Sequence, residues 1–224
     1  MPAGHLRLLR CLELAHQSFL VGGQPVGSVI VAGSGEPVSE GRNRAYDPAG
    51  GTDRLPRTPI AHAEMNALAG VDTRTDLSGM TLWSSHQPCI MCAAACEFTG
   101  MGAVVFIAPD PSDDHLGQDP DGIPTEWVIA ANLLFLSGVA AYSGPSSPMI
   151  MQAGQREPEI ISLMRIIGDT ALRQPALRDA LAPAWPDIQA AASDRRSRHG
   201  RTTQALRRQP HQRRIPGQRS RSMT

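Results

Sequence analysis

Two short motifs hold the residues of this sequence that are best suited to chemistry. His62 and Glu64 lie in "TPIAHAEMNALAG", residues 58–70, and Cys89 and Cys92 lie in "HQPCIMC", residues 86–92. A neutral imidazole and thiolates are ligands that zinc binds well, and three protein ligands leave the fourth tetrahedral position to water, as in catalytic zinc sites. The two motifs therefore predict a catalytic Zn2+ site made of His62, Cys89 and Cys92.

Glu64 stands two positions after His62 and is not needed as a metal ligand. A carboxylate beside a metal-activated water can accept the proton of that water and return it to a substrate. We therefore predict that Glu64 is the catalytic acid and base of the site.

Each motif is predicted to begin a helix. Residues 58–70 read as a short helix capped by Thr58 and ended by Gly70, and a second helix is expected to start at Pro88. Residues two positions apart point about 200° apart around a helix, so His62 and Glu64 can converge only beyond the N-terminal end of theirs. Because ligands usually bind where the loops and helix starts of an α/β sheet meet at one edge, the two motifs are expected to face each other there.

The rest of the chain alternates between strand and helix patterns. Strands are expected at 25–33, 38–45, 79–85 and 102–108, a fifth strand at 138–144, and helices at 5–21, 125–136 and 157–168. This order predicts an α/β fold, a three-layer α/β/α sandwich around one mixed five-stranded sheet.

The two motifs resemble the zinc-dependent cytidine deaminase-like superfamily, whose signature is H-x-E followed by P-C-x-x-C. Here these are "HAE" at 62–64 and "PCIMC" at 88–92, and the similarity extends over about residues 5–168. With histidine as the first metal ligand, the chain is similar to the branch of the superfamily that contains guanine, cytosine, deoxycytidylate and tRNA adenosine deaminases. The resemblance implies zinc-dependent hydrolytic deamination of an amino-purine or amino-pyrimidine base or nucleoside, with release of ammonia and no organic cofactor.

The resemblance also implies substrate contacts. Asn43, in "GRNR", would bind the base or ribose, and the backbone around Ala63 would contact the substrate's amide-like edge. A turn residue that bonds only its own backbone is the alternative for Asn43. Gln87 stands where many purine-acting relatives have glutamate, which bears on the identity of the substrate. By analogy with the family, a homodimer is expected.

Charge is distributed unevenly along the chain, which contains no lysine. Residues 1–192 hold 11 arginines against 20 acidic residues, whereas residues 193–224 hold 10 arginines against Asp194 alone. We predict a zinc deaminase domain at 1–170, a weakly helical extension at 171–192, and a disordered arginine-rich tail at 193–224. This tail either binds a nucleic acid by counterion release or neutralises the acidic body of the chain.

Several alternatives remain open from the sequence. The chain has no apolar run of the roughly 18 to 20 residues that a membrane span needs and no signal-peptide pattern, so a cytoplasmic protein is expected. A small-molecule substrate is favoured because the acidic body offers little to phosphate, but a tRNA wobble-adenosine deaminase that uses the basic tail is the alternative enzyme. A non-catalytic zinc-stabilised binding protein is a third reading. A closed structural zinc site would need a fourth ligand, for which His86 and Cys96 are the candidates.

Overall fold

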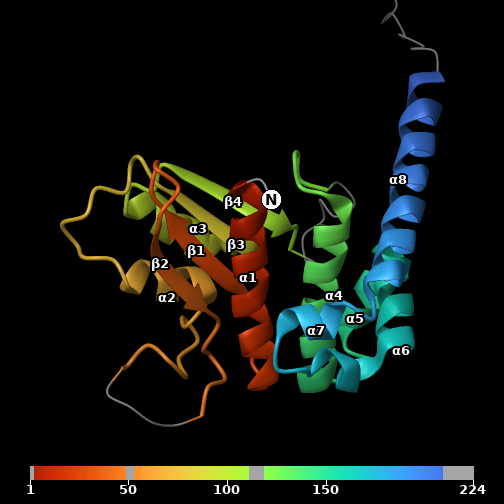
Figure 1. The fold of residues 1–224 in the computed structure, drawn as a ribbon, viewed down its shortest axis with the longest axis horizontal. Coiled ribbons are helices and arrows are strands. Elements are labelled where there is room, and N and C mark those ends of the chain that lie inside the picture. The colour runs from red at the N-terminus through yellow and green to blue at the C-terminus, as the bar shows by residue number, and fades with distance from the viewer. Residues whose placement is uncertain (1–2, 49–52, 111–118, 209–224) are drawn as a thin grey trace, which may run out of the picture.

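The computed structural model describes residues 3–48, 53–110 and 119–208, which form three layers (Figure 1). In this part of the chain a four-stranded sheet has the order β2-β1-β3-β4, with bounds Gly27–Val31 (β1), Pro37–Arg42 (β2), Thr81–His86 (β3) and Ala103–Ala108 (β4). β1 pairs antiparallel with β2 and β3, while β3 and β4 are parallel. The predicted α/β fold with a mixed sheet is confirmed, but the sheet has four strands and not five.

Helices cover both faces of this sheet. α2 (Ala63–Ala69) and α3 (Ile90–Phe98) lie on one face, where Ala67 and Cys96 pack with Ile30 and Leu82. α1 (Ala3–Leu20) and α4 (Thr125–Ser143) lie on the other, where the core includes Val29. Because side chains alternate along a strand, the neighbouring residues Val29 and Ile30 of β1 pack into the cores on opposite faces of the sheet.

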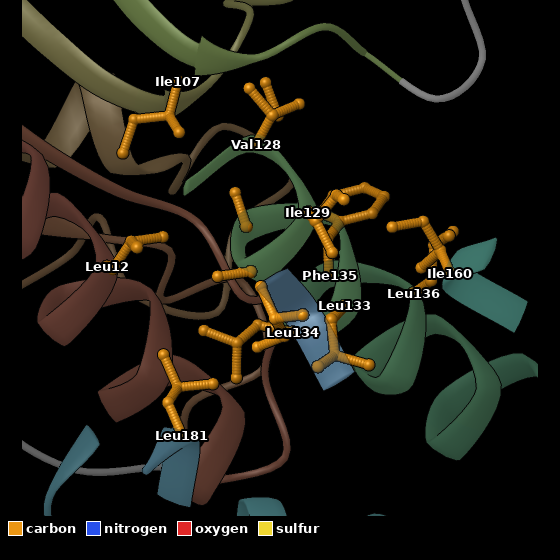
Figure 2. Packing of buried hydrophobic residues seen from close by; sticks show 14 of the residues in the cluster. Leu12, Ile107, Val128, Ile129, Leu133, Leu134, Phe135, Leu136, Ile160 and Leu181 are labelled. Atoms are coloured by element: carbon orange, nitrogen blue, oxygen red, sulfur yellow. The ribbon is translucent and has the colours of Figure 1, made fainter. Parts of the chain in front are cut away.

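Four more helices gather beside α4, which is the centre of the larger core. They are α5 (Pro148–Arg156), α6 (Pro158–Leu172), α7 (Leu177–Leu181) and α8 (Trp185–Arg208), and α8 extends past the rest of the molecule in Figure 1. Figure 2 shows side chains of α4 packed among residues of α1, β4, α6 and α7: Leu12, Ile107, Ile160 and Leu181. Leu177, Leu181 and Ile188 belong to this same core, so the residues predicted as an extension at 171–192 pack against the body.

The fifth strand predicted at 138–144 is wrong, because α4 continues to Ser143. Gly138 does not end the helix. A Cβ atom at this position would lie 2.5 Å from ring atoms of Pro25, so the glycine allows α4 to cross the start of β1 closely. Among the described residues α4 is the one helix long and apolar enough to cross a membrane, yet 72% of its apolar window is buried inside the protein, as in a core helix.

The helix predicted at 58–70 begins later, at Ala63. Thr58 belongs to a turn in which its hydroxyl donates to the carbonyl of Leu55 at 2.6 Å, and His62 takes the N-cap position with an extended backbone. β2 approaches this helix closely: a Cβ atom on Gly41 would collide with the backbone of Ala63 and Ala67. The glycine therefore allows the helix that carries Glu64 to lie directly on the sheet.

The tail predicted to be disordered at 193–224 is helical as far as Arg208, where α8 ends. Arginine and alanine have high helix propensity, and Arg195 is buried against acidic side chains of the body. Residues 209–224 lie outside the described residues. The division into domains at 170 and 192 stays a prediction.

Candidate metal centre and catalytic site

The structure brings the three predicted metal ligands together. His62 Nδ1 lies 3.5 Å from Cys89 Sγ and 3.6 Å from Cys92 Sγ. All three ligand atoms are within 4.8 Å of one another. A tetrahedral zinc with Zn–S of about 2.3 Å and Zn–N of about 2.0 Å separates nitrogen from sulfur by about 3.5 Å. The residues therefore fit zinc in both chemistry and spacing.

The ligands come from the starts of two helices. His62 is the N-cap residue of α2 and Cys89 is the N-cap residue of α3, and both have extended backbones. Neither side chain forms a capping hydrogen bond with its own helix. Cys92 lies three residues further along α3 and is fully buried. The predicted convergence beyond the N-terminal end of a helix is what the structure shows, with the helix starts shifted.

Asn66 fixes the backbone on which His62 stands. Its amide nitrogen lies 2.9 Å from the carbonyl oxygen of His62, 3.0 Å from that of Ala61 and 3.1 Å from that of Arg42. These bonds tie the turn before α2 to the end of β2. Asn66 is therefore expected to hold the backbone of His62 in place without being a metal ligand itself.

We expect the Asn66→Ala variant to bind zinc about tenfold more weakly, since loss of a group that orients a ligand typically costs that much in metal affinity. Competition with a chromophoric chelator measures the change. The Ser39→Ala variant is the matched control, because Ser39 also bonds a carbonyl of α2, that of Ala67, but at the far end from His62. Equal affinities for the two variants would contradict this role of Asn66.

Glu64 is buried and lies in the first turn of α2. The hydroxyl of Ser84 donates to Glu64 Oε1 at 2.8 Å, and Ser28 donates in turn to Ser84 at 3.1 Å. Glu64 lines the same cavity as His62 and Cys89. The serines therefore hold the predicted catalytic carboxylate beside the ligand cluster.

Sequence reasoning missed Ser28 and Ser84. The two residues are opposite each other in the antiparallel pairing of β1 and β3. Ser28 interrupts an otherwise apolar strand, Ser84 follows the apolar pair Leu82 and Trp83, and both serines are buried. Buried hydroxyls need partners. A polar residue at the same height in two neighbouring strands was therefore the available signal.

The thiol of Cys92 depends on a cation for its charge. Burial raises its pKa, and the nearby Glu64 carboxylate and Cys89 raise the pKa further. The proton therefore stays on this sulfur at neutral pH unless a positive charge displaces it. Metal binding at this site is expected to release a proton.

A cavity of about 370 Å³ opens onto the ligand cluster. Its wall includes Gln24, Asn43, Tyr46, His86, Gln87 and Phe135. Asn43 accepts a hydrogen bond from the backbone of Ala45 at 3.0 Å through its side-chain oxygen, which is the local turn contact considered above, and it also faces the cavity. Ala63 is fully buried, and its side chain does not belong to the described lining.

The two candidate fourth ligands are engaged elsewhere. His86 Nδ1 lies 3.2 Å from the hydroxyl of Ser85, and His86 Nε2 lies 3.3 Å from Asn132 Oδ1. Cys96 packs in the apolar cluster between α3 and the sheet. In the described part of the chain neither belongs to the close group of ligand atoms. This arrangement favours an open fourth position, which is typical of catalytic zinc.

Comparison with known proteins places these motifs among deaminases. Residues 5–108 match the model of the cytidine and deoxycytidylate deaminase zinc-binding region. A tRNA(Ile)-lysidine synthase of Deinococcus radiodurans is 33% identical over 127 residues, which are 55% of this chain and 20% of that protein. A tRNA-specific adenosine deaminase of Aquifex aeolicus is 33% identical over 102 residues, which are 44% of this chain and 62% of that protein.

Among solved structures, the guanine deaminase of Bacillus subtilis is 30% identical and superposes with a TM-score of 0.40 over 47% of this chain and 64% of that protein. The chain thus spans less than two thirds of each of these three relatives. Residues 5–108, which match the family model, nevertheless contain the whole ligand cluster and Glu64. Residues 5–108 are thus similar to the cytidine and deoxycytidylate deaminase zinc-binding region.

Proposed function

We propose that this protein is a zinc-dependent hydrolase that deaminates an amino-purine or amino-pyrimidine, as the free base or the nucleoside. The observation that carries the proposal is that the cluster of His62, Cys89 and Cys92 lies at a cavity that a buried carboxylate, Glu64, also lines. Zinc in such a donor set supplies the activation of water near neutral pH.

The part assigned to the protein's own residues is proton transfer. Glu64 accepts one proton of the attacking water and passes it to a ring nitrogen of the heterocycle. It then accepts the second proton, from the hydroxyl group that the water has become, and passes it to the departing amine. Ammonia leaves and a ring carbonyl remains. Ser84 holds one carboxylate oxygen at 2.8 Å, so the carboxylate has a fixed orientation during these transfers.

The cavity is suited to a small heterocycle. Its volume of about 370 Å³ is in the range of pockets that enclose a small ligand. Because the oxygen of the Asn43 side chain accepts a bond from Ala45, the amide nitrogen is the part that would donate to an acceptor on the base or ribose. The backbone around Ala63 is the second proposed contact.

A small substrate is preferred to tRNA because the first arginines of the predicted tail pair with the protein itself. Arg196 lies 2.8 Å from Glu126, and Arg198 lies 2.6 Å from Glu159. Arg195 is buried, 2.6 Å from Glu157. These pairs support the view that this part of the tail neutralises the acidic body.

A screen for ammonia release by the zinc-loaded full chain tests the proposal. The substrates are purine and pyrimidine bases, their nucleosides and tRNA. We expect ammonia from at least one base or nucleoside, and the same rate from a chain that ends at Arg208. Release from tRNA alone, abolished by that truncation, would replace the proposal with the tRNA deaminase. Failure of every substrate would favour the zinc-stabilised binding protein.

The homodimer is also a proposal, supported by the exposed apolar face of α3. Ile90 is 89% exposed and Phe98 is 92% exposed, and the neighbouring β4 forms the edge of the sheet. We expect wild-type protein to be a dimer and Phe98→Glu to be a monomer, because a charge in an apolar interface loses its hydration. Sedimentation velocity at micromolar concentration measures the difference.

The Ile166→Glu variant is the control for this experiment, because Ile166 is 67% exposed on α6, away from α3. It is expected to remain a dimer. A monomeric wild-type protein, or a Phe98→Glu variant that stays dimeric, would overturn this choice of interface.

A further inference from the structure

A chain of buried polar side chains links α8 to the wall of the cavity. Arg195 on α8 is 1% exposed, and its guanidinium lies 2.6 Å from Glu157 Oε1. Asn132 on α4 is fully buried and donates from its amide nitrogen to both oxygens of Glu157, at 3.0 and 2.9 Å. The oxygen of Asn132 lies 3.3 Å from Nε2 of His86, at the end of β3.

The hydrogen bonds of this chain have one consistent direction. The amide nitrogen of Asn132 donates to the carboxylate of Glu157, so it is the amide oxygen that faces His86. Because an oxygen can only accept here, the proton of the imidazole ring is on Nε2. The hydroxyl of Ser85, 3.2 Å away, then donates to Nδ1. Burial lowers the pKa of His86 to about 4, so this ring is neutral near neutral pH. The network therefore selects one tautomer and one orientation of the ring.

The ring of His86 lies at the cavity together with that of Phe135. Their centroids are 4.5 Å apart with an angle of 34° between the planes, and both residues line the cavity that holds Glu64. Because both nitrogens of His86 are engaged by the protein, the ring can offer a ligand only its apolar surface. Flat heterocycles gain binding energy by packing against such ring surfaces.

We propose that His86 and Phe135 form the surface against which the heterocycle packs, and that Asn132, Glu157 and Arg195 are positioning residues that hold His86 in place. The choice of a heterocycle as ligand rests on the proposed function. The positioning residues all lie beyond residues 5–108, the region that matches the deaminase family. The C-terminal helices thus contribute to the specificity of a site whose metal ligands come from the N-terminal half.

The positioning role of Asn132, Glu157 and Arg195 is tested without a substrate. In the full chain with 15N-labelled histidine, the ring nitrogens of His86, assigned with His86→Gln, are expected to report the Nε2–H tautomer. Asn132→Leu removes the acceptor, and Glu157→Gln with Arg195→Met removes both charges of that pair, although Asp119, 3.2 Å from Arg195, then loses this partner. Both variants are expected to show a mixture of tautomers while keeping one zinc per chain.

Arg196→Met is the matched control, because Arg196 is the next residue of the same helix and pairs with Glu126 at the surface. It is expected to leave the His86 signals unchanged. A single Nε2–H tautomer in both network variants would overturn the positioning role. If the double variant fails to fold, Asn132→Leu alone decides this point.

The proposed contact between the heterocycle and His86 is tested by calorimetry, which measures the binding of cytidine, adenosine and guanosine to zinc-loaded protein. At least one probe is expected to bind and to shift the ring signals of His86. His86→Gln keeps a hydrogen-bonding side chain but removes the ring, so it is expected to weaken that probe about tenfold. In the network variants KM for the substrate should rise more than kcat falls.

Failures of the two proposals are distinguishable. A probe that binds without moving the His86 signals, or that binds His86→Gln as tightly as wild type, would overturn the contact while leaving the deaminase proposal intact. Ammonia release without any His86 effect would have the same meaning. If no probe binds and no substrate yields ammonia, the proposed function and the contact both fall, whereas the tautomer measurement still decides the role of Arg195, Glu157 and Asn132.

Discussion

Replacing Glu64 by glutamine is expected to lower the rate of ammonia release roughly 10³-fold, within the range that general acid and base catalysis contributes. Glutamine has the size of glutamate and its oxygen can still accept the bond from Ser84, 2.8 Å from the carboxylate in the structure. It cannot take up and return a proton. Because Glu64 is not one of the clustered ligand atoms, zinc content should remain one ion per chain.

The measurement compares kcat with the metal content of the same preparation. Ser84→Ala is the matched control, since it leaves the carboxylate in place and removes only the bond that orients it, so a smaller loss is expected. Full loss of zinc in Glu64→Gln would mean that Glu64 is a ligand. Undiminished ammonia release from the zinc-loaded variant would assign the proton transfers to another residue.

The site was predictable because its residues are close in the sequence within each motif. Two positions separate His62 from Glu64, and three separate Cys89 from Cys92, so local spacing alone limits where each pair can point. The starts of the helices were not predictable in the same way. Thr58 and Pro59 suggested an earlier start of the helix. In the structure both residues belong to a turn, closed by a hydrogen bond from the backbone of Ala61 to the carbonyl of Thr58, and α2 begins only after this turn. The roles of these residues as ligands and catalyst stay predictions.

The fifth strand shows where patterns of apolar residues fail. The run at 138–144 is short, apolar and starts with glycine, and such runs do not distinguish a buried strand from the end of a buried helix. The glycine that suggested the start of a strand is explained by Pro25, far away in the sequence, against which Gly138 packs inside α4. No local property of the run contains that contact.

The first part of the predicted tail, residues 193–208, is helical, and its composition does not indicate this. Its composition is rich in arginine and poor in apolar residues, which is typical of disordered segments. Arg195 nevertheless has a buried partner, Glu157, that only the folded chain supplies, and Ile188 and Ala192 of the same helix join the core. Composition averages over a segment, whereas burial is decided residue by residue.

Replacing Arg195 by methionine is expected to lower the free energy of unfolding by about 3–5 kcal/mol, the usual cost of leaving one member of a buried ion pair alone. Glu157 would then be a buried carboxylate with only the amide of Asn132 as a described partner on that side. Arg196→Met, which removes a half-exposed partner of Glu126, should cost at most about 1 kcal/mol. Urea unfolding near neutral pH measures both differences.

The penalty in Arg195→Met is expected to depend on pH with a defined sign. Burial raises the pKa of Glu157, and the charge of Arg195 opposes that effect, so removal of Arg195 raises the pKa further. The folded variant then binds a proton more tightly than the unfolded chain, whose glutamates have a pKa of about 4.3. The penalty relative to wild type is therefore complete above the folded pKa of Glu157 in the variant and decreases as pH falls through that value. It vanishes below the folded pKa of Glu157 in the wild type, which burial already raises. A difference from wild type that stayed constant from neutral pH down to the carboxylate range would show that the loss comes from packing of the arginine stem and not from the unpaired charge.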